Sequence, residues 1–100
     1  MEKFTILVLY TAKNEGDRES FVKELTESGV LDAIRNEDGC LAYEYYYSNE
    51  NTKSLALYEM WESPEHQKVH MTQPHMKTAM EIKSKYIDSV KLKKIKISDL

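Results

Sequence analysis

The chain is poor in cysteine, proline and glycine, and it has no long apolar run. Its 100 residues include one cysteine, two prolines and three glycines. The single Cys40 excludes an internal disulfide and suits a reducing compartment. No stretch approaches the roughly 20 apolar residues of a membrane span, and residues 1–3 lead into a strand-like run without a signal-peptide cleavage site. We therefore expect a cytoplasmic protein that is not embedded in a membrane.

The chain also lacks a basic excess. Its formal net charge is −3 at pH 7, whereas nucleic-acid modules usually carry surplus positive charge. One basic cluster alternates with apolar residues, which is typical of the solvent side of an edge strand, and it consists of Lys91, Lys93, Lys94 and Lys96. Nucleic acid is therefore not an expected partner. The length suits a single domain, residues 1–100, in which any ligand pocket shares the one core.

What the sequence does contain is a regular succession of strand and helix patterns. Branched and aromatic residues predict strands at about 3–11, 40–48, 53–62 and 88–97, the last with a bulge between Leu92 and Ile95. Spaced apolar residues and cap signals predict helices at about 17–36, with an interruption at Ser28-Gly29, from Pro64, and at about 74–85. The expected inward residues of the first helix are Phe21, Leu25, Leu31 and Ile34.

This order of elements predicts an α+β fold. Strand, helix, strand, strand, helix, strand is the ferredoxin-like βαββαβ plan, with helices on one face of a four-stranded antiparallel sheet. The opposite face has a large apolar share, contributed by Ala42, Tyr46, Ala56, Tyr58 and Met60. Because an exposed apolar patch usually marks an interface, we expect a homodimer in which two sheets face each other.

The segment 59–76 concentrates the residues suited to chemistry, since it holds the only tryptophan, both prolines and all three histidines. His70 is the expected catalytic base, because an imidazole titrates near neutral pH. Glu59 is expected to orient His70, and Trp61, on the same strand face, to form the floor of an apolar pocket. The same three residues also fit a purely structural role as buried core.

Other side chains near this segment are candidates for binding a substrate. Tyr43 and Tyr45 share a strand face with Tyr47 and could hydrogen-bond a quinone-like oxygen, although such tyrosine rows often only pack. His66 lies one helical turn before His70, and His75 follows a proline at a helix start. His66 and His70 have metal-ligand spacing but lack the glutamate of a zinc-protease motif, so no metal is expected. No nucleotide-binding or catalytic-triad motif is present, and no organic cofactor is expected.

The chain resembles the antibiotic biosynthesis monooxygenase family, especially its quinol monooxygenase-like members. The resemblance covers nearly the whole length, and the residues that carry it are Gly16, Gly39-Cys40 before Tyr43, Glu59-x-Trp61-Glu62-Ser63, His66, His70 and Pro74-His75-Met76-Lys77. It implies a dimeric α+β barrel with a pocket between the sheet and the helices. Haem-degrading relatives use an asparagine in the first strand and a helical histidine. Neither occurs here, where the helical region carries Ala79-Met80, so haem is not expected.

The resemblance leaves several activities open, because related barrels include monooxygenases, isomerases and proteins of no known activity. The leading expectation is a cofactor-independent monooxygenase that oxidises a small phenolic, quinol or polyketide-like molecule with O2. The alternative is an isomerase of a small hydroxylated ketone or sugar-derived signal metabolite. A third hypothesis is a non-catalytic, ligand-binding stress-response barrel.

Overall fold

The structure is a computed structural model that describes residues 3–98. In chain order the elements are β1 (Phe4–Ala12), α1 (Asp17–Glu27), α2 (Val30–Arg35), β2 (Cys40–Tyr47), β3 (Ser54–Trp61), α3 (Pro64–Met71), α4 (His75–Tyr86) and β4 (Ile87–Lys94). Ser63 begins α3 as its cap, since its side chain accepts a hydrogen bond from the backbone N–H of His66, and Pro64 follows at the first helical position.

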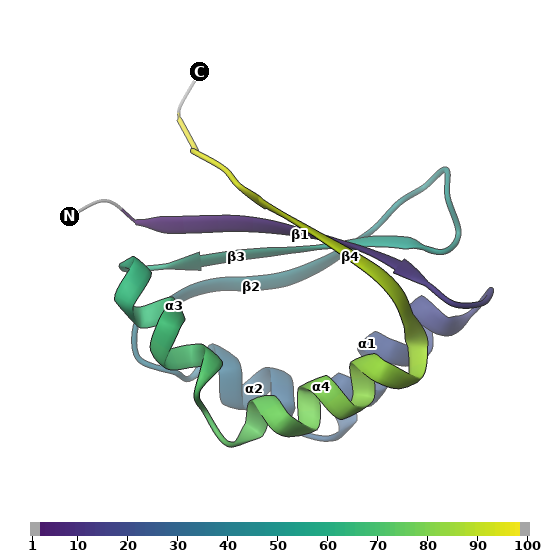
Figure 1. The fold of residues 1–100 in the computed structure, drawn as a ribbon, viewed down its shortest axis with the longest axis horizontal. Helices are drawn as coiled ribbons and strands as arrows, with labels where there is room; N and C mark the ends of the chain where they lie inside the picture. The colour runs from purple at the N-terminus through teal and green to yellow at the C-terminus, as the bar shows by residue number, and fades with distance from the viewer. Residues whose placement is uncertain (1–2, 99–100) are drawn as a thin grey trace.

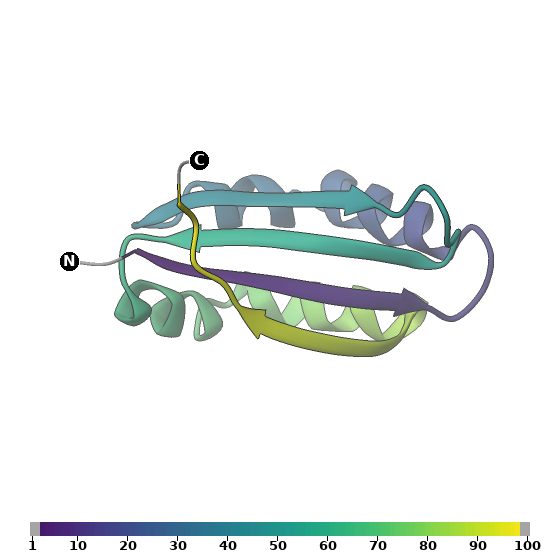
Figure 2. The same cartoon turned by 90° about the horizontal axis from the view of Figure 1, so that it is seen from above.

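The strands form one antiparallel sheet in the order β2-β3-β1-β4. The helices all lie on one side of this sheet (Figure 1), and the view from above shows the strands side by side over them (Figure 2). This arrangement confirms the predicted ferredoxin-like α+β fold.

The core lies between the sheet and the helices, where the predicted inward residues are found. Phe21, Leu25, Leu31 and Ile34 are all buried. The predicted face of β3 is also buried along its whole length, and it consists of Leu55, Leu57, Glu59 and Trp61. On the opposite face Ala56, Tyr58 and Met60 are half-buried. The alternation of the sequence therefore predicted both faces of this strand correctly.

The helix predicted at 17–36 is two helices. Gly29 separates α1 from α2 with a φ of 84°, a conformation that favours glycine and ends the first helix. The Ser28 hydroxyl then accepts a bond from the backbone N–H of Val30. The sequence-based prediction of an interruption at this dipeptide is confirmed, and the break is complete rather than a kink.

The last strand differs from its prediction. It begins at Ile87 and ends at Lys94, and the bulge predicted between Leu92 and Ile95 is wrong. The irregularity lies at the other end of the pairing, where Thr11 pairs with Ser89 but Ala12 pairs with Ile87. Beyond Lys94, the backbone N–H of Ile95 still donates a hydrogen bond to the carbonyl oxygen of Thr5. The phase slip in the sequence therefore reflects the end of regular strand, not a bulge.

A membrane-spanning helix is not among the elements: within residues 3–98 no helix is both long enough and apolar enough to cross a bilayer.

Candidate functional site

A cavity of about 210 Å³, called here the inner cavity, lies between the sheet and the helices. Side chains of β1, β2 and β3 form its floor and side chains of the helices form its roof. Its lining includes Ile6, Val8, Tyr10, Phe21, Leu25, Leu31, Ile34, Tyr43, Tyr45, Glu59, Gln67, His70, Met76 and Ala79. Its rim is formed by Met71, Met80, Lys83, Val90 and Leu92. The space is mostly apolar with a few polar groups, which is the usual make-up of a small-molecule site.

The rim of the inner cavity is unusually apolar for a surface. The exposed fraction is 60% for Met80, 59% for Leu92 and 53% for Met71. Leu92 pairs with buried Val8, so it projects to the helix side of the sheet although its strand is at the edge. An apolar molecule that enters between α4 and β4 would contact mostly apolar side chains, with Lys83 the charged residue of the rim.

The floor of the inner cavity carries a group of tyrosines, Tyr10, Tyr43 and Tyr45. Their rings are in contact, with centroids 6.1 Å apart in both the Tyr10–Tyr45 and the Tyr43–Tyr45 pair. Burial, reinforced by neighbouring tyrosines and by Glu59, holds the pKa of each hydroxyl well above its ordinary value. The hydroxyls therefore stay protonated and can donate hydrogen bonds to an anionic oxygen in the cavity. Tyr47, from the same row of the sequence, is exposed and lies under the Arg18 guanidinium instead.

His70 lies in the wall of the inner cavity, at the C-terminal end of α3. Only 1% of the residue is exposed. Its Nδ1 is 2.9 Å from Oε2 of Glu37 and 3.1 Å from Oε1. Glu37 does not line the inner cavity, so Nε2 is the ring nitrogen left for a molecule bound there. A carboxylate on one nitrogen fixes the tautomer of the ring and directs the other nitrogen as a base.

Glu59 lines the same cavity but does not hydrogen-bond His70 as the sequence predicted. Its Oε1 accepts a hydrogen bond of 2.9 Å from Nε1 of Trp61. Burial raises the pKa of the Glu59 carboxyl, an effect opposed by the Trp61 hydrogen bond and by the charge of His70. The carboxylate that orients His70 is Glu37, because the side chain of Glu59 is held by its neighbour on the same strand face.

Trp61 also differs from its expected place. It is fully buried, with an exposed fraction of 0%, and it does not line the inner cavity. Its ring packs against that of His70, with centroids 4.6 Å apart and planes inclined by 32°. The indole therefore packs against the imidazole of His70 and does not line the inner cavity.

Glu37 is the candidate site residue that sequence reasoning missed. Besides His70 it binds His75, whose Nε2 is 2.6 Å from Oε2 of the same carboxylate. The Glu37 side chain is only 9% exposed, although it lies in the polar turn between α2 and β2. The local sequence gives little indication of these contacts, since the histidines that Glu37 binds are 33 and 38 positions away. One usable signal was the presence of two histidines that needed a carboxylate.

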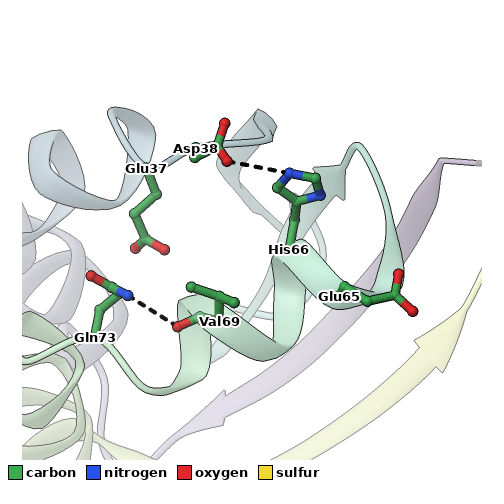
Figure 3. A pocket seen from close by; sticks show the side chains of 6 residues that line it. All are labelled: Glu37, Asp38, Glu65, His66, Val69 and Gln73. Carbon is green, nitrogen blue, oxygen red and sulfur yellow. Dashed lines mark hydrogen bonds and ion pairs between the residues drawn. The ribbon is translucent and has the colours of Figure 1, made fainter.

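The remaining predicted binding residues lie outside the inner cavity. His75 contacts Glu37 but does not line that cavity, and His66 lines a different one. This second cavity, called here the outer cavity, has a volume of about 310 Å³ and is lined by Glu37, Asp38, Glu65, His66, Val69 and Gln73 (Figure 3). His66 is held there by Ser63, whose Oγ is 2.6 Å from Nδ1, and by Asp38, 3.4 Å from Nε2.

The ring of His66 packs on Gly39, which fixes its place. Gly39 has a φ of 80°, and a Cβ built on it would lie 2.3 Å from Cδ2 of His66. Only glycine therefore fits this position without displacing the imidazole. His66 therefore packs against the turn at the start of β2 and lies outside the inner cavity.

The residues that the structure describes do not form a metal site. Among residues 3–98, no group of three or more His, Cys, Asp or Glu side chains is placed to hold a metal ion. Each buried polar side-chain atom in the same range has a hydrogen-bond partner. The inner cavity therefore brings together an imidazole, a buried carboxyl and phenol hydroxyls around a small, mostly apolar space.

A comparison with known protein families gives a match for this chain. The family model described as antibiotic biosynthesis monooxygenase matches residues 4–82. No curated protein matches the chain.

Solved structures similar to this chain share its fold. A protein from Pseudomonas aeruginosa is 19% identical with a TM-score of 0.81, and the match covers 99% of this chain and 97% of that one. A candidate antibiotic biosynthesis monooxygenase from Nitrosomonas europaea is 20% identical with a TM-score of 0.78, over 93% and 88% of the two chains. A protein from Mycobacterium tuberculosis is 19% identical with a TM-score of 0.78, over 99% and 98%.

Proposed function

Because this chain belongs to the antibiotic biosynthesis monooxygenase family, we propose that it is a cofactor-independent monooxygenase acting on a small phenolic, quinol or polyketide-like ring. The observation that carries the proposal is the buried His70 in the wall of an apolar cavity, with a carboxylate on Nδ1 and Nε2 left for the substrate. A general base of this kind suits a reaction that begins by removing a proton from a hydroxylated ring.

In the proposed reaction the substrate itself supplies the electrons. Nε2 of His70 takes the hydroxyl proton, and the electron-rich anion then reacts with O2. A hydroquinone and O2 give a hydroxyquinone and water, so one oxygen atom enters the ring and the other leaves. Neutral Tyr43 and Tyr45 donate hydrogen bonds to the anionic oxygen, and the dry cavity strengthens these bonds.

Oxygen uptake with a panel of hydroquinones and phenols tests the proposal. We expect substrate-dependent O2 consumption without added flavin or metal, and a loss of kcat/KM of about 100-fold or more in His70→Gln, as for removal of a general base. The matched control is His66→Gln, because His66 lies on the same helix but outside the inner cavity. Equal turnover under strict anaerobiosis would refute a monooxygenase.

An isomerase is the second candidate, and the placement of Glu59 favours it. Glu59 and His70 line one cavity, and burial raises the pKa of the Glu59 carboxyl, which favours its protonated form. Two such groups could move a proton between neighbouring carbons of a hydroxylated ketone. This reaction consumes no O2, so the anaerobic arm of the same assay distinguishes the two candidates.

We also propose a homodimer formed through the outer face of the sheet. Cross-strand pairs there join Leu7 to Tyr58 and Leu9 to Ala56, with Met60 and Tyr46 beside them. No helix within residues 3–98 covers this face (Figure 1). A second copy with the same apolar face would bury it without disturbing the inner cavity.

A further inference from the structure

Glu37 stands between the inner and the outer cavity. His70 lines the inner cavity, Glu37 lines the outer one, and no residue lines both. The contact between them, 2.9 Å from Nδ1 to Oε2, therefore crosses the wall that separates the two spaces. In Figure 3 the Glu37 carboxylate points toward the Gln73 side of the outer cavity.

His75 connects this contact to the surface. Its Nε2 is 2.6 Å from Oε2, the same oxygen that is nearest to His70. The His75 side chain is 24% exposed, compared with 1% for that of His70. The side chains of His70, Glu37 and His75 thus form a continuous series of contacts from a buried imidazole to a partly exposed one.

The proposed reaction has a use for such a connection. A substrate that fills the inner cavity also blocks the apolar rim formed by Met71, Met80 and Leu92, so water cannot reach His70 from that side. The proton taken up at Nε2 must nevertheless be held away from the anion while O2 reacts, and a proton must then be returned to the departing oxygen. Of the cavity-lining groups, Glu59 offers no exit, because its hydrogen bond leads to the fully buried Trp61.

We propose that Glu37 and His75 form a proton path from His70 to solvent, separate from the substrate entrance; this inference rests on the proposed role of His70 as the base. One proton enters at Nε2 of His70 while another leaves Nδ1 for Oε2 of Glu37. The path requires the His75 tautomer with its proton on Nδ1, so that Nε2 can accept the proton from Glu37 while Nδ1 releases one to water. The reverse sequence delivers a proton to the departing oxygen and restores the starting tautomers. No electrons move and no bond between heavy atoms changes.

Other charged and titratable groups surround Glu37 from several elements. Asp38 follows it in the chain, His70 and His75 reach it from α3 and α4, and its charge is felt by Cys40, Tyr43 and Glu59 on the sheet. Burial is the main cause of the raised pKa of these last three groups, and the Glu37 charge adds to it. Burial thus favours the protonated form of these three groups, and the two histidines are the titratable side chains in hydrogen-bond contact with Glu37.

The variant His75→Gln tests the path without removing the contact. A glutamine amide can still donate a hydrogen bond to Glu37 but cannot carry a proton onward. The control is His66→Gln, which lines the outer cavity without touching Glu37 in the hydrogen-bond network. Circular dichroism and backbone NMR spectra establish that both variants are folded.

The first measurement needs no substrate. In protein with ¹⁵N-labelled histidine, NMR gives the rate at which the proton on Nδ1 of His70 exchanges with solvent. We expect about tenfold slower exchange in His75→Gln, restoration of the rate by added imidazole in the outer cavity, and no change in His66→Gln. Unchanged exchange in His75→Gln, or slowing that imidazole does not reverse, would overturn the path.

The second measurement separates this inference from the proposed function. If a phenol or quinol supports O2 uptake, kcat should fall in His75→Gln with KM unchanged and should recover with imidazole; a change in KM alone contradicts the path. If no tested ring supports O2 uptake, the proposed oxidation fails, whereas the exchange measurement still decides whether protons leave through Glu37 and His75.

Discussion

Glu59 is the residue whose burial has the clearest consequence for pH dependence. Burial raises the pKa of its carboxyl above the ordinary 4.5, so the folded state holds this proton more strongly than the unfolded state. The associated stability is fully present below pH 4.5 and is lost as the pH rises through the folded-state pKa. At neutral pH the wild-type protein therefore carries a penalty for this side chain.

Glu59→Gln removes that penalty and keeps an oxygen for the Trp61 N–H. We expect the variant to unfold with a larger free energy than the wild type at about pH 8, and with an equal one at about pH 4. Urea denaturation across this range provides the measurement, with exposed Glu62→Gln as the control. A difference between wild type and variant that stays constant with pH contradicts the proposed burial effect.

At the same scale, the sequence predicted which residue types form the site better than it predicted their pairing. His70, Tyr43 and Tyr45 line the inner cavity, and their strand or helix face could be predicted because alternation and helical spacing decide which way a side chain points. Glu37 was missed because a glutamate in a polar turn is usually solvated. Its partners are set by how α3 and α4 dock, which is not encoded in local sequence.

Among the elements, the β2–β3 hairpin depends on a side chain from outside it. Nη1 of Arg18, on α1, lies 2.9, 3.0 and 2.8 Å from the carbonyl oxygens of Ser48, Asn51 and Ser54. The guanidinium also lies 4.6 Å from the centre of the Tyr47 ring. One cation thus fixes the end of the hairpin to the first helix.

Arg18→Met should loosen this end of the hairpin while keeping the aliphatic part of the side chain. We expect a loss of about 1 to 2 kcal/mol in the free energy of unfolding, because bonds from a charged donor to partly exposed carbonyls are lost. Hydrogen exchange of the amides in 48–54 should accelerate. Arg18→Lys, which keeps a charged donor, should retain part of the effect; two variants indistinguishable from wild type would show that Arg18 does not hold the hairpin.

The elements themselves were predictable, and their exact limits were less so. Ser63-Pro64 located the start of α3 because cap chemistry is local. The limits of β4 were misplaced, since its irregular pairing depends on how Ile87 and Ser89 align with β1. Register between distant strands is a property of the sheet and not of one segment.

For the whole molecule, the uncovered sheet face leads to a prediction about assembly. Tyr58 is central on this face, since it pairs with Leu7 of β1 and with Glu44 of β2. Tyr58→Glu would place a charge in the proposed interface without touching the inner cavity. We expect the dimer dissociation constant to rise at least about tenfold, because a central aromatic residue is replaced by a buried charge.

Sedimentation equilibrium over a range of concentrations measures this change. The control Lys23→Glu alters charge on the exposed surface of α1, away from the sheet, and should leave the assembly unchanged. Wild-type protein that remains monomeric at all concentrations would rule out the proposed interface.

The contact between His70 and Glu37 also has a consequence for how the chain folds. Glu37 belongs to the first strand-helix-strand half, and His70 and His75 belong to the second, 33 and 38 positions later. A contact of such long range closes late, after each half has acquired its local structure. Trp61 is the only tryptophan and rests against His70, so its fluorescence should report the arrival of that ring in refolding experiments. The His70–Glu37 contact would then form only after the two halves of the chain have come together.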